Sequence, residues 1–153
     1  MKIVIPGGSG QVGTILARAF QQEGHEVVVI GRRPVARPWR MISWDGVSLG
    51  DWSKELDGCD AVINLAGRSV NCRYTAANRK AILDSRVRST RVVGQAIAQA
   101  GRPPRVWLQA STATIYSVVR RRSRFGWHRQ LHGPLCLDRR ALAERCAGSH
   151  LRP

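Results

Sequence analysis

The sequence predicts an α/β fold built on a doubly wound parallel sheet, and three observations predict it. A short apolar run over residues 2–6 stops at a glycine-rich turn, and an amphipathic helix follows at once. A second apolar run covers residues 25–30, and two more, over 60–67 and 105–109, flank a long helical stretch over 75–100. Apolar strands without polar alternation, joined by helices, are typical of a parallel sheet buried on both faces.

The turn over residues 7–13 (GGSGQVG) predicts a diphosphate-binding site. Its glycines have the spacing G-x-x-G-x-x-G and lie between a strand and a helix. Residues without a Cβ let backbone N–H groups approach phosphate oxygens, and the helix N-terminus adds unpaired donors and partial positive charge. The residues expected to hold a dinucleotide pyrophosphate are Gly7, Gly8, Gly10, Gln11, Val12 and Gly13. The alternative is a glycine-rich turn that binds nothing.

Helical periodicity predicts which faces of the two helices are buried. In the first helix the apolar stripe is Val12, Ile15, Leu16, Ala19 and Phe20, and Gly24 supplies a left-handed cap. In the second, over 75–100, it is Ile82, Ser89, Val93, Ala96, Ile97 and Ala100. A third strand over 39–45 and a short helix within 46–58 complete a five-stranded sheet with expected order 3-2-1-4-5.

Two arginines follow the second strand, where this type of fold meets the adenine ribose. Arg32 and Arg33 have no acidic residue beside them, which favours the 2′-phosphate of NADP over NAD. A solvated loop is the alternative. Asp45, at the end of the third strand, is expected either near the adenine or as a plain turn aspartate.

Three stretches together resemble one family: GGSGQVG at 7–13, INLAG at 63–67 and STATIYS at 111–117. They are similar to the short-chain dehydrogenase/reductase superfamily, in its extended NAD(P)-dependent epimerase/dehydratase branch. The segment from Asn64 through 83–91 (LDSRVRSTR) resembles the "epimerase family protein" subgroup. The resemblance covers residues 2–117 and implies a Rossmann-like NAD(P)-binding domain.

The resemblance also implies site residues and a reaction. Asn64, Ala66 and Gly67 match the turn beside the cofactor riboses, and Thr112 matches the catalytic Ser/Thr that hydrogen-bonds the substrate oxygen. The implied cofactor is NADP, with NAD as the alternative. Intact relatives are expected to move a hydride to or from a sugar-like or small carbonyl or alcohol substrate, whose identity the sequence does not specify.

One family feature is missing. Family chemistry depends on a Tyr-x-x-x-Lys pair, whose lysine lowers the tyrosine pKa for proton exchange. Here Tyr74 is followed four residues later by Asn78, and Tyr116 by Arg120. We therefore expect a catalytically impaired oxidoreductase domain. The alternative is a non-catalytic NADP-binding sensor whose dinucleotide state controls a partner.

Residues 118–153 do not resemble the family. They hold nine arginines against Asp138 and Glu144, a charge of +7 within a chain total of +15, and show neither helical nor strand periodicity before a short predicted helix at 138–147. We predict an NAD(P)-binding domain over 1–117 and an irregular basic tail over 118–153, arising from a frameshift or truncation of a longer reductase. The sheet should then expose an apolar edge at the fifth strand, causing marginal stability, self-association or both.

Other readings of the composition are weaker. Nucleic-acid binding by the basic tail is less favoured than a solvated tail. We expect His128, His132, Cys136 and Cys146 to be incidental residues rather than a zinc site, because Gly126, Gly133 and Pro134 interrupt any helix that would carry the first three. The four cysteines lack paired spacing, and no run has the length of a signal peptide or membrane span. We expect reduced thiols and a cytoplasmic location.

Overall fold

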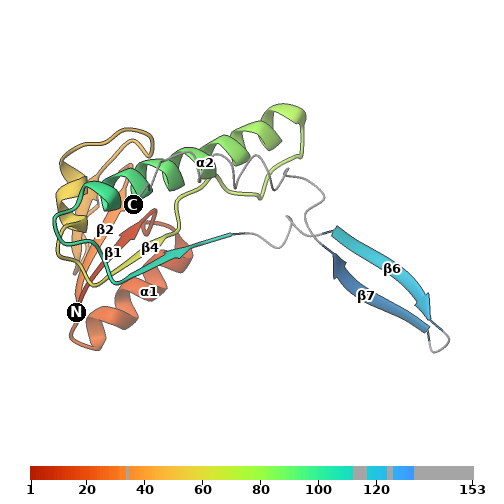
Figure 1. Ribbon diagram of the computed structural model, residues 1–153, viewed down its shortest axis with the longest axis horizontal. Coiled ribbons are helices and arrows are strands. Elements are labelled where there is room, and N and C mark those ends of the chain that lie inside the picture. The colour runs from red at the N-terminus through yellow and green to blue at the C-terminus, as the bar shows by residue number, and fades with distance from the viewer. Residues whose placement is uncertain (34, 112–116, 124–125, 133–153) are drawn as a thin grey trace, which may run out of the picture. The chain divides into compact units, whose positions relative to one another are not determined.

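The computed structural model describes residues 1–33, 35–111, 117–123 and 126–132. The chain forms two compact units, Met1–Ala110 and Ser111–Pro153. The elements of the first unit are β1 (Lys2–Pro6), α1 (Gln11–Gln22), β2 (Glu26–Gly31), β3 (Arg40–Ser43), the 3₁₀ helix η1 (Asp51–Leu56), β4 (Ala61–Asn64), α2 (Ala76–Gln99) and β5 (Val106–Gln109) (Figure 1).

The five strands of this unit form one parallel sheet in the order β3-β2-β1-β4-β5, which confirms the predicted order. β1 lies at its centre, where Ile3 is in register with Val27 of β2 and with Ala61 of β4. This order places the crossovers that follow β1 and β4 on opposite sides of the sheet, as in doubly wound folds.

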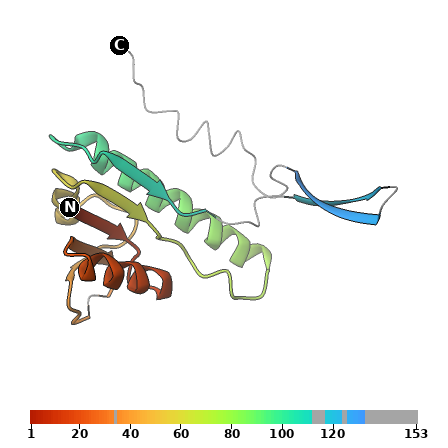
Figure 2. The ribbon, with the colours of Figure 1, turned by 90° about the horizontal axis from the view of Figure 1, so that it is seen from below.

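The helices cover the two faces of the sheet separately (Figure 2). On one face α2 and η1 pack on a cluster of buried residues that includes Val4, Val62 and Val93. On the other face α1 packs through Ala17 on a cluster that includes Ile5. Because both faces are covered near β1, its central residues are fully buried, which explains the uninterrupted apolar run.

The predicted buried stripe of α1 is wrong in part. Leu16 and Phe20 pack against the core, but Val12 and Ile15 are each 62% exposed, and Ala19 is exposed. The buried residues of α1 are Gly13 and Ala17 instead. The small residue Gly13 allows the helix backbone to approach Gly8 of the glycine-rich turn, where a Cβ would lie 2.3 Å from the Gly8 Cα. This approach sets the rotation of the helix more strongly than the larger apolar side chains do.

The long second helix confirms the predicted boundaries. Thr75 caps its N-terminus by accepting a hydrogen bond from the Asn78 N–H, and the helix ends at Gln99. Of the predicted stripe, Ser89, Val93 and Ala96 are buried and Ile82, Ile97 and Ala100 are half-buried. Val92 is also buried, because the face in contact with the sheet is broader than the predicted stripe.

β5 presents an apolar sheet edge, as predicted. Its side chains Val106, Trp107 and Leu108 are 47%, 40% and 54% exposed. Within the described residues β5 pairs with β4 and with no other strand. The parallel sheet therefore carries exposed apolar side chains and unpaired backbone groups at this edge.

The second unit contains an antiparallel hairpin of β6 (Ser117–Ser123) and β7 (Gly126–His132). These two segments pair as strands, although their sequence shows no strand periodicity. Backbone pairing, which places Arg120 opposite Arg129, does not require an alternation of apolar and polar residues, so periodicity could not detect it. The predicted helix at 138–147 lies outside the described residues.

Among the helices that the structure describes, none combines the length and apolar character that crossing a membrane requires.

Candidate functional site

The glycine-rich turn lies where the carboxyl ends of three strands meet. The Gly7 N–H donates to Ile30 O of β2 over 2.7 Å, and the Leu65 N–H, just after β4, donates to Pro6 O over 2.8 Å. These bonds hold the turn after β1 between the ends of β2 and β4. At this place the chain leaves β1 toward one face and β4 toward the other, which is the topological switch point of such sheets.

Packing within the chain explains three of the glycines in the turn. Gly7 has a φ of +76°, and a Cβ there would lie 2.5 Å from the Ala66 backbone. A Cβ on Gly13 would lie 2.3 Å from the Gly8 Cα, and one on Gly8 would lie 2.9 Å from Ile5 Cγ2. Side chains at these positions would force the turn, β4 and α1 apart.

Gly10 differs from the other glycines of the turn because no packing contact with the described residues requires it. Its φ of −77° is accessible to any residue, and a Cβ there would meet only Gly7 O at 3.9 Å. Gly10 is the N-cap of α1, with no side-chain capping bond, and the first turn holds no acidic residue. The start of α1 therefore combines free helix N–H donors with open space above the backbone.

A surface pocket of about 410 Å³ lies beside the turn and is lined by Ser9, Arg32 and Arg33. Ser9 approaches the end of β2 closely, since a Cβ on Gly31 would lie 3.0 Å from Ser9 Oγ. Both arginines are exposed, and no carboxylate of the described residues forms a salt bridge with either of them. The pocket offers two guanidinium groups and a hydroxyl to an anion.

Sequence reasoning missed Ser9 as a pocket residue. The available signal was its position between two glycines of the turn, where a short hydroxyl side chain can face a bound group. Asp45 is a turn aspartate, because its Oδ1 accepts from the Val47 and Ser48 N–H groups at 2.8 Å each. These hydrogen bonds lower the pKa of Asp45, and the bond from the Ser48 N–H has the largest effect.

Asn64, at the end of β4, organises the turn that follows this strand. Its side chain is fully buried, its Nδ2 donates to Gln109 Oε1 over 2.8 Å, and its Oδ1 accepts from the Ala66 N–H over 3.0 Å. Ala66 is half-buried and Gly67 is exposed. The structure thus brings the predicted residues Asn64, Ala66 and Gly67 beside the glycine turn, through the contact between Ala66 and Gly7.

Three side chains of α2 hold the same turn from the other side. Ser85 Oγ accepts from the Arg68 N–H over 2.9 Å, and Arg86 Nη1 donates to Arg68 O over 3.2 Å. Ser89 Oγ lies 3.3 Å from Ala66 O. Sequence reasoning assigned no site role to these residues, although a buried serine on an apolar helix stripe was a signal.

Other sequence predictions fall elsewhere. Thr112 and Tyr116 lie outside the described residues, as do Cys136 and Cys146, and Tyr74 is an exposed residue just before α2. In the part of the chain that the structure describes, no three His, Cys, Asp or Glu side chains form a group that could hold a metal ion. Cys59 is buried, and burial raises the pKa of its thiol to about 11.

The sequence model of the family described as "NAD dependent epimerase/dehydratase family" matches residues 3–128. The match continues past Ser117, where the motifs recognised in the sequence end. "Epimerase family protein SDR39U1" from Bos taurus is 36% identical over 119 residues, which are 76% of this chain and 38% of the relative. "Epimerase family protein YfhF" from Bacillus subtilis is 31% identical over 121 residues, which are 77% of this chain and 40% of the relative.

One solved structure is similar to this chain in both fold and sequence. It is the crystal structure of human epimerase family protein SDR39U1 (isoform2) with NADPH, with a TM-score of 0.65 and 31% identity. The similarity covers 78% of this chain and 39% of the human one. The chain thus spans about two fifths of the length of the relatives it matches.

Proposed function

The chain belongs to the NAD dependent epimerase/dehydratase family, and from this premise we propose that it binds NADP(H) at the carboxyl ends of β1, β2 and β4. The observation that carries the proposal is Gly10, a glycine that neither the backbone nor the packing of the chain requires. A group outside the chain accounts for it, since a diphosphate can approach the backbone only where no Cβ intervenes.

The pyrophosphate belongs at the start of α1. Residues 7–13 bring the helix N-terminus to the open space above Gly10, and the N–H groups there have no capping side chain. A diphosphate would supply acceptors for these donors and negative charge for the positive end of the helix. Val12, which is 62% exposed on the first turn, offers an apolar surface next to the bound cofactor.

The adenosine 2′-phosphate belongs in the pocket of Ser9, Arg32 and Arg33. Two guanidinium groups form charge-assisted hydrogen bonds with a phosphate, whereas the 2′-hydroxyl of NAD would not neutralise them. The relative solved as a complex with NADPH supports this choice of cofactor. NADP is accordingly preferred over NAD.

The nicotinamide half belongs beside Asn64, Ala66 and Gly67, with Thr112 orienting the substrate oxygen. When bound, the cofactor supplies or accepts a hydride. This chain contributes positioning, and its 153 residues contain no Tyr-x-x-x-Lys pair to exchange the accompanying proton. We therefore propose dinucleotide binding with very slow turnover as the function of the chain.

Titration of the full chain with NADPH and NADH, followed by the fluorescence of its five tryptophans, tests the proposal. We expect saturable binding of both, with NADPH tighter by roughly tenfold or more because of the 2′-phosphate. Replacing Arg32 and Arg33 together with glutamine should remove most of that preference and leave NADH binding unchanged. If neither nucleotide binds, the proposed function is wrong; if both bind equally, the NADP assignment is wrong.

We also propose that the chain self-associates through β5. The exposed side chains Val106, Trp107 and Leu108 support this proposal, as does the outer edge of β5, which pairs with no strand of the described residues.

A further inference from the structure

We propose that Ser85, Arg86 and Ser89 of α2 are positioning residues that fix the turn 66–68 and so hold the nicotinamide half of the bound dinucleotide. The inference rests on the proposed function, because it assigns a role within the same site. We call these three side chains the α2 clasp.

The clasp and Asn64 together hold four backbone groups of the turn. Ser85 accepts from the Arg68 N–H, Arg86 donates to Arg68 O, and Ser89 lies within hydrogen-bond distance of Ala66 O. Asn64 accepts from the Ala66 N–H. The turn follows β4 and has no strand or helix of its own, so these side chains replace the hydrogen bonds that secondary structure would supply.

Steric contacts extend the clasp to both sides of the turn. A Cβ on Gly67 would lie 3.2 Å from Cγ and Cζ of Arg86, so the turn packs directly on this side chain. On the opposite side, Ala66 approaches Gly7 so closely that only glycine fits there. A shift of the turn toward the glycine-rich turn is blocked by Gly7, and a shift toward α2 is blocked by Arg86.

The two serines of the clasp are less favourable in a helix than alanine would be. Serine is a weaker helix former than alanine because its hydroxyl competes for backbone hydrogen bonds. Ser89 nevertheless occupies a buried position, 1% exposed, on the face that packs against the sheet, where its hydroxyl is within donating distance of both Arg86 O, at 3.0 Å, and Ala66 O, at 3.3 Å. Ser85 lies one turn earlier on the same face, and its hydroxyl also donates to Ile82 O over 2.9 Å.

The position of the clasp in the sheet determines which half of the cofactor it serves. The pocket of Ser9, Arg32 and Arg33 lies at the end of β2, and the turn 66–68 follows β4, on the other side of the central strand β1. A dinucleotide lies across this switch point with one nucleotide on each side. The clasp therefore acts on the half of the molecule that does not carry the 2′-phosphate.

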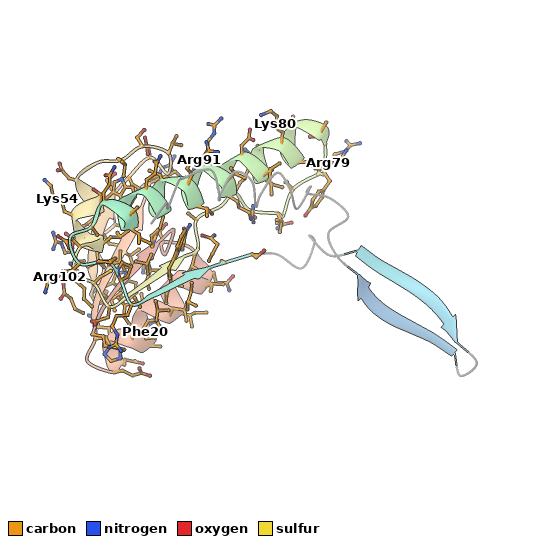
Figure 3. All side chains as sticks on the ribbon, in the orientation of Figure 1. Phe20, Lys54, Arg79, Lys80, Arg91 and Arg102 are labelled. Carbon is orange, nitrogen blue, oxygen red and sulfur yellow. The ribbon has the colours of Figure 1, made fainter. Side chains whose placement is uncertain are left out.

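The test compares two probes on the full chain: NADPH, which spans both sides, and adenosine 2′,5′-bisphosphate, which reaches only the arginine pocket. The variants are Arg86→Met and the double variant Ser85→Ala/Ser89→Ala. The matched control is Arg91→Met, which removes an exposed arginine of the same helix whose side chain points away from the sheet in Figure 3. Hydrogen exchange of the Arg68 amide in the ligand-free protein reports the clasp directly.

We expect the dissociation constant for NADPH to rise about tenfold in both clasp variants. The serine variant loses two hydrogen bonds to the turn, and Arg86→Met loses one hydrogen bond to Arg68 O together with the packing of Arg86 on Gly67. The dissociation constant for adenosine 2′,5′-bisphosphate should change by less than about twofold in the clasp variants. The control Arg91→Met should leave the dissociation constants of both probes unchanged. The Arg68 amide should exchange faster in the serine variant, which removes its acceptor.

Equal weakening of both probes would overturn the inference, since the clasp would then merely support the fold. Unchanged NADPH binding with faster Arg68 exchange would also overturn it, because the turn would be loosened without consequence for the cofactor. If the unmodified chain binds neither probe, the proposed function fails and this inference with it. That outcome is recognised before any variant is made.

Discussion

Asn64 and Gln109 join the carboxyl ends of β4 and β5 through a side-chain hydrogen bond, in which Asn64 Nδ2 donates to Gln109 Oε1 over 2.8 Å. The same asparagine accepts from the Ala66 N–H, and its backbone oxygen accepts from the Ala110 N–H over 2.9 Å. One buried amide therefore ties two strand ends to the turn of the candidate site.

Replacing Asn64 with leucine is expected to lower the free energy of unfolding by about 1–3 kcal/mol, because the Ala66 N–H loses its acceptor in a buried place. Replacing Gln109 with leucine should cost less, about 1 kcal/mol, because it removes one acceptor of the buried Asn64 Nδ2 but leaves the Ala66 N–H paired with Asn64 Oδ1. Urea unfolding of both variants measures the difference. Equal costs would show that the pair, rather than the asparagine, stabilises the site.

Substitution by alanine should affect stability and NADPH binding differently at Gly10 and Gly13. Gly10→Ala should leave stability within about 0.5 kcal/mol of the original, because its backbone is unstrained and its Cβ is unobstructed, yet it should weaken NADPH binding about tenfold or more. Gly13→Ala should cost about 2–3 kcal/mol, because its Cβ would overlap Gly8. Thermal unfolding and fluorescence titration test both, and strong NADPH binding by Gly10→Ala would contradict the assignment of the pyrophosphate.

Glu55 of η1 joins the first residues of β1 and β3, Lys2 and Arg40, through two ion pairs. Its carboxylate, 11% exposed, lies 2.9 Å from Lys2 Nζ and 2.9 Å from Arg40 Nη2. Glu55→Gln is expected to lower the unfolding free energy by about 1–2 kcal/mol, because both cations lose a partner but remain partly hydrated. Glu23→Gln, at a 66% exposed side chain, is the control and should change it by less than about 0.5 kcal/mol. A similar effect at both positions would argue against this ion pair.

Because of Cys59, the stability of the folded chain should fall at alkaline pH. Burial raises its pKa in the folded chain from 9.0 to about 11, so the folded state retains a proton that the unfolded state has released. Stability is therefore complete below about pH 9 and falls as the pH rises toward 11, by about 2–3 kcal/mol in total.

Urea unfolding at several pH values measures this loss of stability. In Cys59→Ala the loss between about pH 9 and 11 should be smaller by about 2–3 kcal/mol. Mass spectrometry after brief alkylation should also find Cys72, which is half-buried, modified before Cys59. Equal alkaline destabilisation of the original chain and Cys59→Ala would refute the role of the thiol.

The apolar edge at β5 should control self-association. Leu108→Lys places a charge on a side chain that is 54% exposed, so it should cost little stability while repelling a second edge. Sedimentation velocity is expected to show oligomers of the original chain and a shift toward monomer in the variant. Lys80→Leu, a change at an exposed residue of α2, is the control and should not dissociate the oligomers. A monomeric original chain would rule out the proposal.

Much of the fold could be predicted because it depends on local patterns. The strand over residues 25–30, Gly24 with its φ of +78° and the strand order follow from apolar runs, from glycine at the helix end and from helical crossovers. The glycine spacing of residues 7–13, between a strand and a helix, is also a local pattern, and it predicted the switch point. Periodicity failed at Val12, Ile15 and Ala19, because the close approach of Gly13 to Gly8 sets the helix rotation. It failed at β6 and β7, where backbone pairing needs no pattern of side chains.

The sequence by itself determined that an α/β sheet carries a glycine turn at its switch point, because these features arise from neighbours along the chain. Only the tertiary structure decided what surrounds that turn. It brought Ser9 to Arg32 and Arg33, and it placed the α2 clasp on residues 66–68. It also showed that the packing of the described residues requires glycine at positions 7 and 13 but not at position 10. Contacts between distant segments depend on how helices cross the sheet, and no local pattern of residues encodes that geometry.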